Sequence, residues 1–68
     1  MSEKTTLDRL IHMANQIATN LATEPNPADA TARHITRYWD PRMKAMIANY
    51  NGDGLSANAK AAVAQFKT

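Results

Sequence analysis

Prolines and glycines divide this 68-residue chain and constrain its fold more than any other feature of the sequence. Pro25, Pro27 and Pro41 interrupt the first two thirds of the chain, and the turn sequence NGDG interrupts the last third at residues 51–54. The residue before a proline disfavours helical geometry, and glycine beside Asn or Asp tolerates the positive φ of tight turns. The segments between these breaks therefore form short elements that must bury their apolar side chains against one another.

Each segment repeats its apolar residues at helical spacing. The first carries Leu10, Ala14 and Ile17 on one face and places Arg9 and His12 opposite. No segment alternates apolar and polar residues with the two-residue period of a strand. The sequence therefore predicts an all-α fold, a small single domain of three to four short helices. After flexible residues 1–4, the predicted helices span about residues 6–23, 27–39, 41–50 and 57–66.

Residues that favour helix starts stand where the helices are expected to begin. A side-chain oxygen before the first turn accepts a backbone N–H, and proline fits the first helical position. The predicted caps are Thr5 with Asp8, Asn26 with Pro27, Asp40 with Pro41, and Ser56. Because Asp40 and Pro41 end one helix and start the next, we expect a sharp corner there.

Size and composition favour a chain that associates with another protein. A domain of this length buries little surface alone, so docking on a partner would add stability that its own core lacks. The formal net charge is +2, with both signs interspersed, which argues against nucleic acid. The chain has no cysteine, and no apolar run is long enough for a signal peptide or a membrane span. We expect a soluble, cytoplasmic protein.

The two histidines suggest neither catalysis nor a metal site. His12 falls on the polar face of the first helix, and His34 lies on the flank of the second. A nucleophile needs an adjacent base and an orienting group, and no such local arrangement is present. A calcium loop could start at Asn49, but its twelfth position is Lys60 where a bidentate glutamate is required. We therefore expect a plain turn here and no autonomous enzyme.

The segment HITRYWDPRMKAM, residues 34–46, collects aromatic, basic and methionine side chains around the predicted corner. One interpretation is a helix-turn-helix DNA-binding regulator, with Arg42, Lys44 and Asn49 on the second helix. Its turn has no glycine and the net charge is small, so the pattern is weak. The other interpretation is a protein interface, because Trp, Tyr, Arg and Met are enriched in interface centres.

Periodicity divides this segment between a core and a rim. The positions expected to be at least partly buried are Ile35, Trp39, Met43 and Ile47. Arg37, Tyr38 and Arg42 fall off that stripe and are free to meet a partner.

Two longer segments resemble a known family. LIHMANQIA at Leu10–Ala18 and HITRYWDPRMKAMI at His34–Ile47 are similar to the signature segments of the delta subunit of NAD-dependent formate dehydrogenase, and GLSANAKAAV resembles it more weakly. The matching positions are Met13, Ala14, Asn15, His34, Trp39, Pro41 and Met43. The chain departs from the family at Tyr38, where phenylalanine is expected, and at Asn20, where the family tends to be apolar or aromatic.

The resemblance implies a non-catalytic accessory subunit of a cytoplasmic enzyme complex. Its catalytic alpha subunit would oxidise formate to carbon dioxide at a molybdenum or tungsten bis-pterin centre, with iron–sulfur clusters passing electrons to FMN and NAD on other subunits of a complex that includes beta and gamma. The delta subunit would bind no cofactor, and a chain without cysteine lacks the usual ligands of an iron–sulfur cluster. Assembly, cofactor insertion and stability of the complex all remain open as its role.

We expect docking on the catalytic alpha subunit, mainly through the corner, and neither nucleic acid nor membrane as a partner. The predicted contacts are Met13, Asn15, His34, Arg37, Tyr38, Trp39, Pro41, Arg42 and Met43. A chaperone that leaves the finished enzyme and a small DNA-binding regulator stay open as alternatives.

Overall fold

The computed structural model describes residues 3–65, with side chains from Thr6 onward. It contains four helices, α1 (Glu3–Asn20), α2 (Pro27–Tyr38), α3 (Pro41–Ala48) and α4 (Ala57–Gln65). No strand occurs in this part of the chain, so the prediction of a small, single, all-α domain is confirmed.

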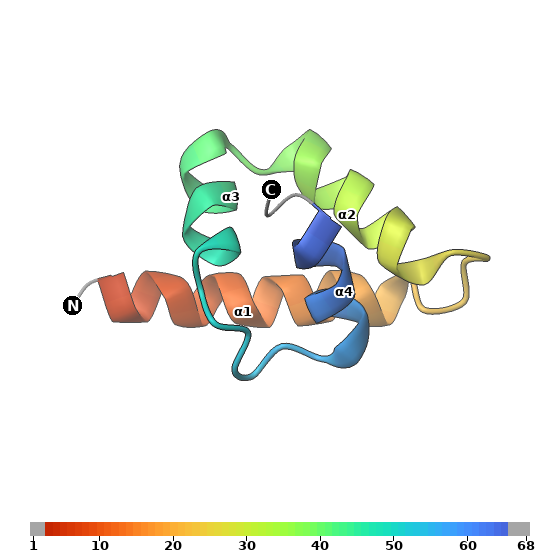
Figure 1. Ribbon diagram of the computed structural model, residues 1–68, viewed down its shortest axis with the longest axis horizontal. Coiled ribbons are helices and arrows are strands. Elements are labelled where there is room, and N and C mark those ends of the chain that lie inside the picture. Colours follow the sequence, from red (N-terminus) through yellow and green to blue (C-terminus); the bar gives the residue numbers. More distant parts are fainter. Residues whose placement is uncertain (1–2, 66–68) are drawn as a thin grey trace.

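The long first helix organises the molecule, which measures 37 × 20 × 19 Å. Figure 1 shows α2 and α3 above α1 and joined at a sharp corner, with α4 beneath α2. All three of the other helices contact α1. The most extensive contact joins α2 to α4, which are far apart in the sequence. The fold therefore depends on bringing the end of the chain back between its first two helices.

The core lies where the helices meet. Its large side chains come from every helix, from the corner between α2 and α3, and from the loop before α4: Leu10, Ile35, Trp39, Ile47, Leu55 and Val63. Alanines fill the helix contacts of α1 and α4, where Ala14, Ala18, Ala59 and Ala62 are buried, and small side chains let helix axes approach closely. The periodicity predictions for Ile35, Trp39, Met43 and Ile47 are confirmed, with Met43 half-buried. Phe66, expected on the apolar face of the last helix, lies outside the described residues.

Two of the predicted caps close the ends of helices as expected. The Asp40 carboxylate accepts the N–H of Met43 at 2.8 Å, and the Ser56 hydroxyl accepts the N–H of Ala59 at 3.2 Å. Each bond satisfies a backbone donor that the first helical turn leaves without a partner. The predictions of caps at Asp40 and Ser56 are therefore confirmed.

The other two starts differ from expectation. Asn26 precedes Pro27 at the start of α2, but within the described residues its side chain makes no capping hydrogen bond. The prediction of a capping box at Thr5 is wrong, because α1 already begins at Glu3. Residues 1 and 2, which were expected to be flexible together with residues 3 and 4, lie outside the described part, whereas Glu3 and the following lysine belong to α1.

The first three helices also end earlier than the pattern suggested. After Asn20 the chain tightens, since Ala22 donates to the carbonyl of Thr19, three residues back. Such shorter bonds are common where a helix unwinds. The same tightening follows α3, where Tyr50 donates to the carbonyl of Ile47. The turn at residues 51–54 then forms as predicted, with positive φ at Gly52 and Gly54 and the Asn51 side chain accepting the N–H of Asp53.

Candidate docking surface

The corner between α2 and α3 is a two-residue connection with little freedom. Trp39 and Asp40 both adopt extended backbone geometry, which turns the chain after the last turn of α2. The Lys44 ammonium donates to the carbonyl of Thr36 at 3.2 Å, so α3 is tied back to the end of α2. A cation at that position satisfies a terminal carbonyl and the negative end of the helix dipole. The corner can therefore present its outer side chains in a fixed arrangement.

Trp39 and Met43 support this corner from inside. Trp39 is only 5% exposed and belongs to the core, and Met43 packs against that core while half-buried. Both were predicted as partner contacts. Burial leaves little of the Trp39 ring accessible at the surface, so the ring supports the corner from inside.

The outer side of the corner carries the other predicted contacts. His34, Arg37, Tyr38, Pro41 and Arg42 are all exposed, and we call these five residues the corner patch. Tyr38 is 67% exposed, the most of any large hydrophobic side chain among the described residues. A tyrosine offers a partner an apolar ring and a polar hydroxyl together.

Neighbouring side chains hold the Tyr38 ring in place. The centroids of the His34 and Tyr38 rings lie 4.7 Å apart at an interplanar angle of 44°, as their spacing of one helical turn allows. The guanidinium carbon of Arg37 lies 5.9 Å from the Tyr38 centroid. Such a cation–π contact contributes about 0.5–1 kcal/mol at an exposed site. The Tyr38 ring is thus in contact with two other side chains along the end of α2.

The cations around the corner differ in what they contact. Arg33 lies 3.7 Å from the Asp29 carboxylate one turn earlier, and the Lys44 ammonium is held by Thr36. Within residues 6–65, Arg37 and Arg42 take part in no ion pair. These two guanidinium groups are the charges that the patch can offer to a partner.

A helix-turn-helix would need several exposed side chains on α3, and α3 has few of them. Lys44 is half-buried and already donates to α2, and Asn49 is the residue after the helix end. Arg42 alone of the three predicted DNA contacts is exposed on this eight-residue helix. A recognition helix reads base edges with several side chains from one face, and α3 does not present them.

The two predicted contacts on α1 differ from each other. Met13 is 40% exposed and borders a shallow hollow of about 510 Å³ with Asp8, Arg9 and His12. Asn15 is half-buried, and both ends of its amide are used inside the chain: the NH₂ group donates to the carbonyl of Gly54, and the oxygen accepts the N–H of Ser56, each at 2.8 Å. No local pattern in the sequence indicates this internal role of Asn15.

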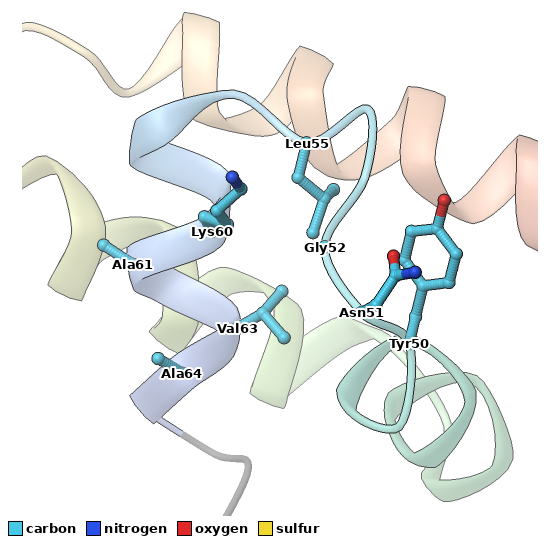
Figure 2. A pocket seen from close by; sticks show the side chains of 8 residues that line it. All are labelled: Tyr50, Asn51, Gly52, Leu55, Lys60, Ala61, Val63 and Ala64. Atoms are coloured by element: carbon cyan, nitrogen blue, oxygen red, sulfur yellow. The ribbon is translucent and has the colours of Figure 1, made fainter.

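A second hollow, of about 390 Å³, lies between α4 and the loop before it (Figure 2). It is lined by Tyr50, Asn51, Gly52, Leu55, Lys60, Ala61, Val63 and Ala64. Figure 2 shows Leu55 and Val63 pointing into the space between the loop and α4. The lining combines apolar side chains with one amine, one amide and one phenol, and it contains neither a carboxylate nor an imidazole.

No group of three His, Cys, Asp or Glu side chains that could hold a metal ion occurs among the described residues. None of the helices in the described part has both the length and the apolar character needed to cross a membrane.

Comparison with known proteins points to one family. The family model described as the NADH-dependent formate dehydrogenase delta subunit FdsD matches residues 9–63. The match spans both segments on which the resemblance rested, together with the corner patch. No curated protein and no solved structure matches the chain.

Proposed function

Since the chain belongs to the family of NADH-dependent formate dehydrogenase delta subunits, we propose that it is a non-catalytic accessory subunit of a cytoplasmic formate dehydrogenase complex. Its partner is the catalytic alpha subunit, in a complex that also contains beta and gamma subunits. The molybdenum or tungsten bis-pterin centre, the iron–sulfur clusters and FMN belong to those partners and not to this chain. Its contribution is to the assembly, cofactor loading or stability of the catalytic subunit.

The observation that carries a docking role is the exposed Tyr38 ring, ordered against His34 and Arg37. Tyrosine and arginine are among the residues that most often dominate the binding energy of protein interfaces. A side chain already held in its binding arrangement loses less conformational entropy on association. Because the core of this domain is small, the apolar surface that is buried on docking also stabilises the fold itself.

Copurification with the catalytic subunit tests the proposal. Tyr38→Ala is expected to weaken the association by about tenfold or more, as removal of an interface anchor does, whereas Tyr38→Phe keeps the ring and most of the affinity. His12→Ala removes an exposed ring from α1 outside the corner patch and serves as the matched control. If Tyr38→Ala combined with Arg42→Ala leaves both the yield of the complex and its formate oxidation unchanged, the corner is not the docking site.

The native mass of the active complex separates a resident subunit from a transient assembly factor. We expect the mass to include this chain. Enzyme produced without the chain then distinguishes the remaining roles: a loss of bound molybdenum or tungsten indicates cofactor loading, whereas full metal content with faster thermal inactivation indicates stabilisation. Full metal content together with unchanged thermal inactivation would contradict an accessory role.

A further inference from the structure

The net charge of the chain is concentrated at the corner. Residues 29–44 hold four of the eight lysines and arginines but only two of the six acidic residues. The rest of the chain therefore has four charges of each sign and is balanced. The whole formal surplus of +2 therefore lies in the segment that contains the corner patch.

Internal contacts occupy some of these charged groups and leave others available. Asp29 lies beside Arg33, and the Asp40 carboxylate caps α3 by accepting the N–H of Met43. Because Lys44 donates to the carbonyl of Thr36, its ammonium is also engaged. Two arginines of the corner patch, Arg37 and Arg42, are exposed and pair with no acid in the described chain.

We infer that the corner patch docks on an acidic surface of the catalytic subunit, whose carboxylates bind Arg37 and Arg42 around the ordered Tyr38 ring. This inference rests on the proposed function and names the chemistry of the partner surface. A guanidinium binds a carboxylate through two parallel hydrogen bonds, and such charge-assisted pairs fix orientation as well as adding attraction. Opposite charges across an interface also accelerate encounter and exclude wrong partners.

A protein carboxylate fits the patch better than a nucleic acid does. Non-specific nucleic-acid binding tracks a backbone with a row of cations and stacks bases on open aromatic faces. The corner offers two available guanidinium groups, and the Tyr38 ring already packs against His34 and lies near Arg37. A duplex DNA is therefore included in the test as a competing probe.

The test measures binding of the purified chain to formate dehydrogenase prepared without it, at a series of NaCl concentrations from about 50 to about 500 mM, across which exposed charges become screened. We expect the wild-type affinity to fall as salt rises. Arg37→Glu with Arg42→Glu should lower the low-salt affinity by about tenfold or more and abolish or reverse the salt dependence, because like charges then face each other and salt screens their repulsion.

Matched controls separate local pairing from overall charge. Arg9→Glu with Lys60→Glu makes the same change in net charge at two exposed residues outside the patch and should keep the affinity within about threefold, as distant charges are screened. Tyr38→Ala should weaken binding while keeping the wild-type salt dependence. Circular dichroism of each variant verifies that the helices are intact.

Different failures overturn different statements. Wild-type chain that binds the enzyme equally at all salt concentrations, or equally after both corner arginines are reversed, overturns the acidic docking surface and leaves the proposed function standing. Wild-type chain that binds the enzyme at no salt concentration overturns the proposed function itself. A duplex DNA that competes with the enzyme for the chain at equal concentration would show that the patch binds polyanions and not a protein surface.

Discussion

The two segments that resemble the formate dehydrogenase delta subunits lie in regions with opposite physical character. At the junction of α1 and α4, polar side chains turn inward: Asn15 binds Gly54 and Ser56, and the Asn58 amide donates to the carbonyl of Ala18 at 2.9 Å. At the corner patch, polar and aromatic side chains turn outward. One family resemblance thus covers residues that build the domain and residues that are available to a partner.

This difference decides which measurement each region should affect. An internal hydrogen bond contributes about 0.5–1.5 kcal/mol to stability, so a side chain that makes two of them contributes about twice as much. An exposed side chain away from caps and cores usually changes stability by no more than about 0.5 kcal/mol. Substitutions at the junction should therefore alter the free energy of unfolding, and substitutions in the patch should alter binding alone.

The largest effect is expected between two adjacent residues of the corner. Trp39→Ala removes a buried side chain and should lower the free energy of unfolding by about 3–5 kcal/mol, enough to unfold most of a domain this small. Tyr38→Ala, next to it but exposed, should leave that free energy within about 0.5 kcal/mol. Trp39 is the chain's single tryptophan, so Trp39→Ala also removes the fluorescence signal that would report unfolding. Urea unfolding is therefore followed by far-ultraviolet circular dichroism.

Trp39→Ala and Tyr38→Ala could also contradict the assignment of Trp39 to the core and Tyr38 to the docking surface. If Trp39→Ala unfolded at the wild-type urea concentration and yet failed to bind the enzyme, Trp39 would belong to the docking surface and not to the core. Copurification alone cannot make this distinction, since an unfolded chain also fails to dock.

Sequence reasoning worked where each signal and its structural partner are close in the chain. Asp40 and Ser56 cap backbone groups three residues ahead, and helical spacing identified Ile35 and Ile47 as core. The exposure of Arg37, Tyr38 and Arg42 followed from the same spacing, because they fall off the buried stripe.

It failed where the partner is distant. Asn15 binds groups 39 and 41 residues away, and nothing near it in the sequence distinguishes it from an asparagine on a solvent-exposed face. The reach of Lys44 back to Thr36 depends on the angle of the corner, which two residues of extended backbone set and no periodicity describes. Family resemblance marked Asn15 as noteworthy, but only the fold shows which atoms it serves.

A smaller effect is expected at the junction. Asn15→Ala leaves the Gly54 carbonyl and the Ser56 N–H without their side-chain partner and should lower the free energy of unfolding by about 1–3 kcal/mol. Hydrogen exchange at the Ser56 amide should accelerate by more than the change at amides in α2, because the loop opens locally. Asn20→Ala, an exposed asparagine on the same helix, is the control and should change stability by no more than about 0.5 kcal/mol.

Equal losses of stability for the two alanine variants would contradict the assignment of Asn15 to the junction. Loss of enzyme binding by Asn15→Ala with stability unchanged would instead place Asn15 on the docking surface, as the sequence alone suggested.

The smallest effect compares two helix starts that look alike in sequence. Asp40–Pro41 and Asn26–Pro27 each combine a capping residue with proline at the first helical position, but among the described residues only Asp40 accepts a backbone N–H through its side chain. Asp40→Ala should therefore lower the free energy of unfolding by about 1 kcal/mol, and Asn26→Ala by less than about half of that. Urea midpoints of the two variants measure the difference, and equal midpoints would show that the Asp40 cap adds nothing to the corner.

Since Asp40 is also the one acid between Arg37 and Arg42 in sequence, its removal should raise affinity for an acidic partner surface slightly while it lowers stability. Opposite signs in these two measurements are expected only if the corner is a folded support for a basic docking patch.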